Sequence, residues 1–286
     1  MRRGIFWVIV GLPLTLIVIG AAVAVSIPTV RHLITGWWNV PDRLPALAAN
    51  PQLHYQPGAE EYAGDVAALL PDAIARIEAA HGRPFAHPVT VGVYATPRAY
   101  ARANGLGTAV PVGVTAFGRV NLSPKLFWPQ QQRLRAILTH ELSHAHIVGW
   151  TGGYAYGRLP NWFKEGLAVM VSDGGGAEFV SEEDARAAIR RREQLVIDDA
   201  GSLRNLVEVR LEKAPAGTPP WYPTVLVYRE AGMFVSYLRA SDGPAFERMM
   251  NAILDGRTFA DAVTAGYHED ARSLWQKFAL TSAERK

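Results

Sequence analysis

Two histidines separated by one helical turn constrain this chain more than any other feature. His140 and His144 belong to the segment H-E-L-S-H, which lies in a run with apolar residues at helical spacing. Because residues four apart lie on the same face of a helix, the two imidazoles can bind one Zn²⁺ ion through their ring nitrogens. Glu141 lies beside them, where its carboxylate can reach a water on the metal. The pattern predicts a helix that carries part of a zinc site.

A zinc peptidase needs a third protein ligand and a fourth position that is open to water. The spacing H-x-x-G-x-x-H does not supply that ligand, because Ile147 and Trp150 occupy its later positions. After a Gly/Tyr-rich segment, residues 151–160, which we expect to be a loop, a second helical run begins at Asn161. Glu165 is its only acidic residue. Burying a carboxylate is costly without a charged partner, and a metal ion is such a partner.

The segments H-E-L-S-H and L-P-N-W-F-K-E-G-L-A together resemble the gluzincin branch of zinc metallopeptidases, specifically the peptidase MA-like group. Members of that group typically show H-E-x-x-H and then W-x-x-E-G-x-A on the next helix. The resemblance covers roughly residues 85–280, and its specific part is confined to residues 137–170. It implies one Zn²⁺ ion per chain and the following site residues: His140, His144 and Glu165 as zinc ligands, and Glu141 as general base.

The resemblance also implies how such a site hydrolyses a peptide bond. Zinc lowers the pKa of its bound water and polarises the scissile carbonyl, while Glu141 takes the proton and delivers it to the leaving amine. The oxyanion then needs a second donor. The resemblance suggests a tyrosine in a segment of the form Y-x-x-x-x-x-F-V-x-Y-L, which nominates Tyr228. Tyr222, which follows a proline-rich loop, is the alternative.

One position departs from the family pattern. Some gluzincins carry an acid one turn beyond the glutamate ligand, where it orients a histidine, but this chain has Val169 there. Asp173 is a candidate for the same role, and a backbone carbonyl is the other candidate. The glycines at 174–176 lack the context of a phosphate-binding loop, so we interpret them as a helix stop.

The N-terminal residues predict an export segment. Residues 4–30 contain no charged residue, and this stretch is longer than the about 20 apolar residues that a helix needs to span a bilayer. Because short basic termini tend to stay inside, we expect residues 1–3 in the cytoplasm and a transmembrane signal-anchor over residues 4–30. The chain would then contact the membrane through this helix, with its catalytic domain outside the cytoplasm. A cleavable signal peptide, giving a secreted or periplasmic protein, is the alternative.

The remaining chain predicts an α+β fold that is helix-rich. Residues 31–60 are rich in proline and are expected to form a juxtamembrane linker, and residues 61–286 the metallopeptidase domain. Residue spacing predicts a helix over 61–80, strands in 89–94 and 109–122, and helices from 225 to 278. The expected sheet is small, antiparallel or mixed, and precedes the zinc helices. The resemblance implies that the domain is zincin-like.

Composition excludes several classes of protein. The chain has no cysteine, which removes disulfides, thiolate ligands and cysteine nucleophiles. Its net charge of +3 includes Arg2 and Arg3, and the basic run at 190–192 lies among acidic residues, so a nucleic-acid partner is not expected. The expected partner is a peptide or protein substrate, and oligomeric state is left open.

Two alternatives to an active peptidase remain. The first is a zinc-stabilised binding module that grips a peptide or protein partner in the cell envelope without cleaving it. The second is an enzyme held latent by residues 151–160. Glu141 favours hydrolysis over the binding module, because a structural zinc site has no need of a base beside an open coordination position.

Overall fold

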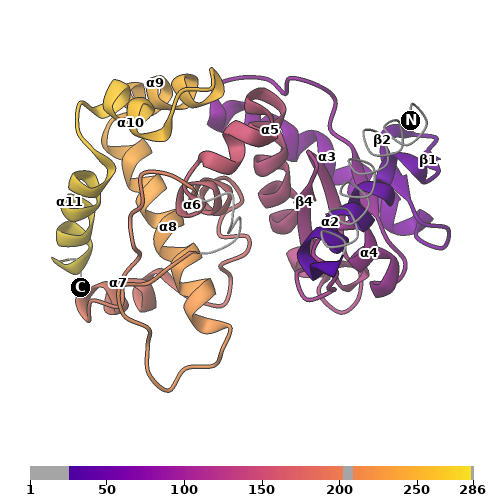
Figure 1. Ribbon diagram of the computed structural model, residues 1–286, viewed down its shortest axis with the longest axis horizontal. Coiled ribbons are helices and arrows are strands. Elements are labelled where there is room, and N and C mark those ends of the chain that lie inside the picture. Colours follow the sequence, from indigo (N-terminus) through magenta and orange to yellow (C-terminus); the bar gives the residue numbers. More distant parts are fainter. Residues whose placement is uncertain (1–25, 202–208, 285–286) are drawn as a thin grey trace, which may run out of the picture.

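A computed structural model of the chain describes residues 26–201 and 209–284. A sheet-bearing N-terminal half and a helical C-terminal half lie side by side in it, with helices α5 (Leu134–Arg158) and α6 (Asn161–Val171) between them (Figure 1). These two helices carry both sequence motifs. The motif residues therefore lie where the two halves of the molecule meet.

The N-terminal half contains one small mixed sheet. Its strands are β1 (Ala46–Leu47), β2 (Asn50–Tyr55), β3 (Val91–Val93), β4 (Gly113–Ala116) and β5 (Arg119–Leu122). They are ordered β1-β2-β3-β5-β4. The three inner strands run parallel, and β1 and β4 pair antiparallel at the two edges. Strand β4 thus forms the sheet edge, and it contacts α5.

Helix α3 (Glu60–His81) connects β2 to β3, as a parallel pair of strands requires. It continues through Pro71, although an internal proline costs about 3 kcal/mol in a helix. Packing offsets this cost, because α3 buries an apolar face and contacts both β2 and α5. Helix α3 therefore holds α5, which carries the first motif, against the sheet.

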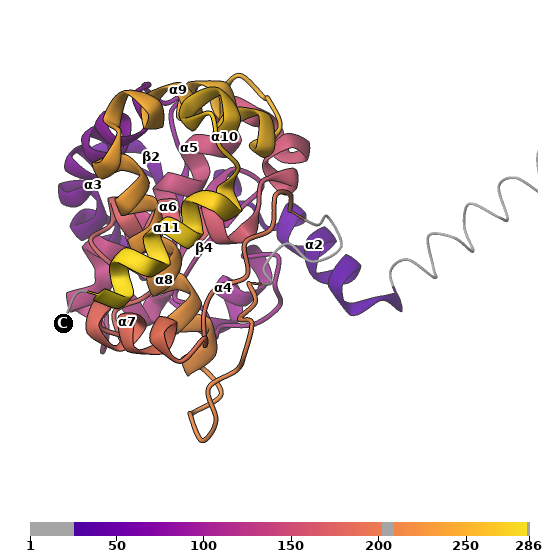
Figure 2. The ribbon, with the colours of Figure 1, turned by 90° about the vertical axis from the view of Figure 1, so that its left-hand side faces the viewer.

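The other elements are mostly helical. They are α2 (Pro28–Trp38), α4 (Pro97–Ala103), α7 (Glu182–Arg190), α8 (Tyr222–Ser241), α9 (Gly243–Leu254), α10 (Phe259–Tyr267), α11 (Ala271–Glu284) and the short 3₁₀ turns η1 (Pro41–Arg43), η2 (Pro124–Leu126) and η3 (Gln131–Arg133). Helix α11 lies across α8 and reaches α7 (Figure 2). Helices α8 to α11 form the C-terminal half, and α8 packs directly on α6.

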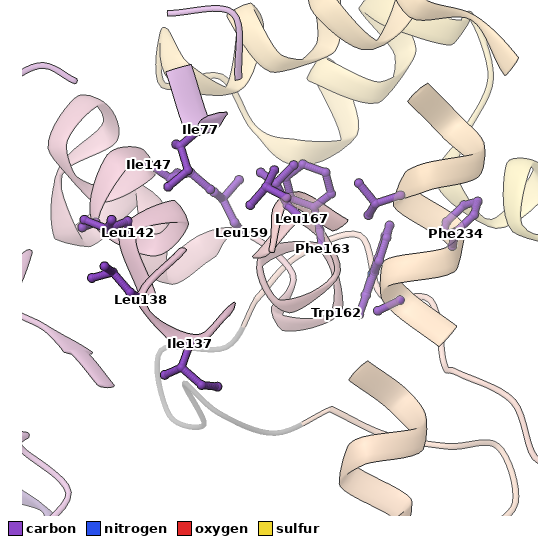
Figure 3. Packing of buried hydrophobic residues seen from close by; sticks show 14 of the residues in the cluster. Ile77, Ile137, Leu138, Leu142, Ile147, Leu159, Trp162, Phe163, Leu167 and Phe234 are labelled. Atoms are coloured by element: carbon purple, nitrogen blue, oxygen red, sulfur yellow. The ribbon is translucent and has the colours of Figure 1, made fainter. Parts of the chain in front are cut away.

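A continuous apolar core joins the two halves through α5 and α6 (Figure 3). Fully buried side chains extend across it from α3 to α8: Ile77, Leu138, Leu142, Phe163, Leu167 and Phe234. Burial of one such side chain stabilises the fold by about 1.5–3 kcal/mol. The helices that carry the motifs are therefore core elements, which limits how far their polar side chains can move.

Two glycines allow α6 and α8 to approach closely. A Cβ atom on Gly166 would lie 2.6 Å from the carbonyl oxygen of Ala231, and one on Gly232 would lie 2.4 Å from Cγ1 of Val169. Both distances are shorter than a normal contact, and the first neighbour is backbone that cannot rotate away. The glycine after Glu165 in the second motif is therefore a packing requirement of this helix pair.

We expect Gly166→Ala to lower the free energy of unfolding by about 1–3 kcal/mol, the usual cost of overpacking. Gly64→Ala is the matched control, because Gly64 also lies inside a helix but has open space around its Cα. Removing a helical glycine there is expected to stabilise the protein by about 0.5–1 kcal/mol. Urea denaturation of both variants measures the difference, and equal effects would contradict a tight crossing at Gly166.

The fold class predicted from the sequence is wrong in including a transmembrane helix. Within residues 26–201 and 209–284, no helix is long and apolar enough to cross a membrane. Most of the predicted anchor, residues 4–25, lies outside the described residues. Helix α2 begins at Pro28, and its 11 residues rise about 16 Å, roughly half of a hydrocarbon core of about 30 Å. The observed fold is helix-rich with a small mixed sheet.

Two other segments differ from the expectation. Residues 31–60, expected as a linker, contain most of α2 and all of η1 and contribute β1 and β2 to the sheet. Residues 151–160, expected as a loop, are largely helical up to Arg158. The helical path breaks at Gly152, whose φ of 72° lies in the left-handed region that favours glycine. The chain thus turns at Gly152 and continues helically, which brings Tyr156 back toward His144.

Candidate metal centre

Three predicted ligands converge between α5 and α6. The Nε2 atoms of His140 and His144 lie 3.1 Å apart. The Oε2 atom of Glu165 lies 3.3 Å from Nε2 of His140 and 3.7 Å from Nε2 of His144. One ligand atom from each residue lies within 4.8 Å of the others, and the described residues contain no second cluster of this kind.

The outer nitrogen of each imidazole faces an oxygen. His140 Nδ1 lies 2.8 Å from the carbonyl oxygen of Gly175, so Nδ1 carries the proton and donates it. His144 Nδ1 lies 3.1 Å from the hydroxyl of Tyr156, which can accept a hydrogen bond in the same way. With Nδ1 as the donor, Nε2 is the nitrogen of each ring that faces the cluster, and it can bind a metal once it has lost its own proton. This is the arrangement of a metal-ligating histidine and its orienting partner.

The distances between the three ligand atoms fit a zinc ion. Zinc binds imidazole nitrogen at about 2.0–2.1 Å and carboxylate oxygen at about 2.0–2.2 Å in tetrahedral geometry, which separates neighbouring ligand atoms by roughly 3.3 Å. The three observed separations are 3.1, 3.3 and 3.7 Å. Three protein ligands also leave one tetrahedral position for water or substrate, as a catalytic site requires.

The cluster is buried and strongly coupled. His140 and His144 are only 5% and 6% exposed. Burial lowers the pKa of His140, but the hydrogen bond and charge of Glu165 outweigh it and raise that pKa to about 9. Burial raises the pKa of Glu165, yet the neighbouring histidines hold it well below its usual range. The carboxylate is therefore ionised and available as a ligand at neutral pH.

Glu141 is held beside the cluster by the edge strand. The Thr115 hydroxyl on β4 lies 2.9 Å from Oε2 of Glu141 and 2.7 Å from its carbonyl oxygen. On the same strand, a Cβ atom on Gly113 would lie 2.8 Å from Cγ of Glu141, so glycine makes room for the side chain. The carboxylate of Glu141 thus has a defined position between α5 and the sheet edge, although it is not among the three converging ligands.

The structure separates the two candidate tyrosines. Tyr228 lies on α8, and its ring stacks near that of His140 with centroids 6.4 Å apart. Burial and the charges of Glu165 and Glu141 raise the pKa of its hydroxyl well above the usual range. Tyr222 lies near Asp184 and Arg191 instead, and its hydroxyl is not influenced by the cluster. Tyr228 is therefore the one of the pair that is brought to the site.

Asp173 does not orient a histidine. It forms an ion pair with Arg76 at the surface, and its side chain is 72% exposed. Val169, at the position where some gluzincins carry an acid, is buried and packs against Gly232 in the α6–α8 crossing. The orienting oxygen comes from Gly175, so the backbone carbonyl and not the acid has this role.

Several residues of the site were not predicted. They are Thr115, Gly175, Tyr156 and Lys164, whose ammonium lies 4.6 Å over the ring of Tyr156. Burial lowers the pKa of Lys164 to about 8, although Glu165 opposes this shift. The glycines at 174–176 were interpreted only as a helix stop, but a Cβ on Gly175 would lie 2.6 Å from the carbonyl oxygen of Ala136 on α5. The glycine run that follows α6 was the sequence feature that could have indicated this close approach to α5.

The chain matches no family model, no curated protein and no solved structure to which it was compared.

Proposed function

We propose that this protein is a zinc-dependent metallopeptidase of the gluzincin type. The observation that carries the proposal is the convergence of His140, His144 and Glu165, at distances that suit one zinc ion, with Glu141 beside them. A purely structural site would be served by the ligands alone. The buried carboxylate of Glu141, held by Thr115 but outside the ligand set, supports a catalytic role.

Each part of the site has a chemical role in this proposal. A bound zinc ion would act as a Lewis acid that polarises the scissile carbonyl and lowers the pKa of water. Glu141 accepts the proton of the attacking water and delivers it to the leaving nitrogen, so its carboxylate is restored after each turnover. The Thr115 hydroxyl keeps that carboxylate in place through its hydrogen bond to Oε2.

Tyr228 is the proposed donor to the developing oxyanion. Its hydroxyl is protonated at neutral pH and can donate a hydrogen bond, and burial beside Glu165 and Glu141 raises its pKa further. The ring of Tyr228 stacks beside the ring of His140, so Tyr228 lies next to one of the proposed zinc ligands. Donors of this kind act most strongly in buried sites, where water does not screen them.

The edge strand β4 is the proposed binding surface for substrate. It pairs with β5 on one side only, and Thr115 links it directly to Glu141. An extended peptide can add to such an edge through backbone hydrogen bonds. Its scissile bond would then lie near Glu141 without needing a particular side chain.

The test is cleavage by the full-length protein. Incubation with a mixture of denatured proteins, followed by mass spectrometry of new chain termini, is expected to reveal cleavage that stops on chelation and returns when zinc is added. Zinc-dependent stability without any new termini would contradict the peptidase and support a binding module.

We expect Tyr228→Phe to lower kcat by about 10²–10³-fold, the usual effect of removing one oxyanion donor. The ring remains, so packing against His140 and zinc content are expected to persist. Tyr222→Phe is the matched control on the same helix, with kcat unchanged because that hydroxyl is not at the cluster. Equal losses in both variants would contradict the assignment of Tyr228.

We expect Tyr156→Phe to weaken zinc binding by about 10–100-fold, because loss of an orienting partner leaves His144 free to rotate. The hydroxyl lies 3.1 Å from Nδ1 of His144. Competition with a metal-binding dye measures the affinity. Tyr154→Phe, on the same helical segment but with an exposed side chain, is the control. An unchanged affinity in Tyr156→Phe would show that His144 is oriented by other contacts.

A further inference from the structure

A concave site lies away from the metal cluster, between the end of α2, the turn η1 and helix α4. Its cavity volume is about 660 Å³. None of its lining residues belongs to α5 or α6, and Figure 1 shows α2 and α4 on the sheet side of the molecule. The site is therefore separate from the proposed catalytic centre.

Close backbone packing builds this pocket. A Cβ on Gly36 of α2 would lie 2.7 Å from Cα of Gly105, so α2 is pressed onto the segment that follows α4. This contact fixes the end of α2, where Trp38 is 61% exposed. The guanidinium of Arg43 lies over the Trp38 ring, 4.5 Å from its centroid. One wall of the pocket thus presents an ordered cation on an aromatic support.

The pocket is positively charged. Its lining contains Arg43, Arg98 and Arg102 but no aspartate or glutamate. Arg98 and Arg102 are four residues apart on α4 and so lie on the same helix face. Three like charges around one cavity repel each other, and a multiply charged anion would relieve that repulsion.

No ion pair in the described part of the chain joins these three arginines to a carboxylate. The nearest acid in sequence, Asp42, is paired with Arg119. The other polar side chains of the lining have partners within the protein: Gln56 accepts from the backbone of residues 95 and 96, and the Tyr94 hydroxyl donates to Asn121. The guanidiniums are thus the groups left to meet a ligand.

We propose that this pocket binds a phosphate group, carried either by a soluble phosphorylated compound or by a lipid headgroup. Phosphate carries about −1.5 to −2 charges at neutral pH and accepts bidentate hydrogen bonds from planar guanidinium groups. Arginine binds such groups through a rigid fork of donors, and it is the only charged residue type in this lining. The exposed indole of Trp38 beside Arg43 adds an apolar surface for the remainder of the ligand.

Calorimetry with pyrophosphate tests the proposal on the full-length protein. Saturable binding of one pyrophosphate per chain is expected, with affinity at least tenfold weaker in Arg98→Gln/Arg102→Gln and weaker at higher salt. Arg190→Gln/Arg272→Gln is the matched control, because both residues are exposed and lie outside the pocket but the change in charge is the same. Arg43→Gln gives an independent test from η1. Zinc content and Tm verify that each variant is folded.

Vesicle flotation distinguishes the two sources of phosphate. Stronger binding to phosphatidylcholine vesicles that contain phosphatidic acid than to phosphatidylcholine alone, with competition by pyrophosphate, assigns a lipid headgroup. Pyrophosphate binding without this preference assigns a soluble ligand. Absence of binding in the wild type, or equal binding by wild type and Arg98→Gln/Arg102→Gln, would overturn the proposal. Equal weakening in the control pair would do the same, since it would show only a general effect of net charge.

Discussion

Replacement of Glu141 by glutamine is expected to lower the rate of peptide hydrolysis by about 10²–10⁴-fold, the usual contribution of a general base. Glutamine has nearly the same shape and can still accept the hydrogen bond from Thr115, so the fold is preserved. It cannot accept a proton from the attacking water. Because Glu141 is outside the ligand cluster, zinc content is expected to remain at one per chain.

Parallel measurements of zinc content and cleavage rate test this prediction. Glu61→Gln, a change of the same chemistry at an exposed position of α3, is the control and is expected to leave both unchanged. A Glu141→Gln protein that cleaves peptides at the wild-type rate would contradict the assignment of the base. Loss of zinc from this variant would place Glu141 among the ligands instead.

Removal of the Glu165 carboxylate is expected to abolish the stabilisation of the protein by zinc. In the wild type, free zinc at about 1,000 times its Kd raises the free energy of unfolding by about 4 kcal/mol, because the ion binds only the folded state. Glu165→Ala leaves two histidines, whose Nε2 atoms no longer share an anionic partner. The gain from zinc should then largely disappear.

Denaturation with and without zinc, after chelation of the purified protein, measures this effect. The Glu61→Gln protein should show the full gain of the wild type. Glu165→Ala also loses a buried ion pair, so its stability without zinc is expected to fall as well. The decisive quantity is therefore the difference that zinc makes within each variant. A full zinc gain in Glu165→Ala would rule out this residue as a ligand.

The positions of the two motif helices could be predicted from the sequence because the signal is local. His140 and His144 lie one turn apart wherever a helix forms, and the apolar spacing around them indicates one. Glu165 could be proposed because a lone acid in an apolar helix needs a charged partner. The convergence of all three depends on the α5–α6 contact, which the sequence alone does not specify.

The partners of the histidines could not be predicted because they depend on where a helix breaks or ends. Tyr156 reaches His144 across a kink at Gly152, where the backbone leaves the helical conformation. Gly175 reaches His140 because a residue without a side chain fits against the backbone of Ala136. Neither contact produces a periodic pattern in the sequence. In both cases the only sequence feature that indicated an unusual backbone position was a glycine.

The N-terminal region was predicted least well. Strand β1 has only two residues and β2 includes Pro51, so both give a weak strand pattern and the segment was interpreted as a linker. Strand β1 also has an irregular register against β2. The apolar composition of residues 4–30 predicted a membrane span, and most of that segment, residues 4–25, lies outside the described residues.

X-ray absorption at the zinc edge of the purified full-length protein directly tests whether His140, His144 and Glu165 form a zinc centre. We expect one zinc ion per chain, bound by nitrogen and oxygen atoms at about 2.0–2.2 Å, with scattering from two imidazole rings. In the Glu165→Ala protein this signal should be lost or changed. A wild-type protein without bound zinc, or with zinc whose spectrum shows no imidazole, would contradict a metal centre formed by His140, His144 and Glu165.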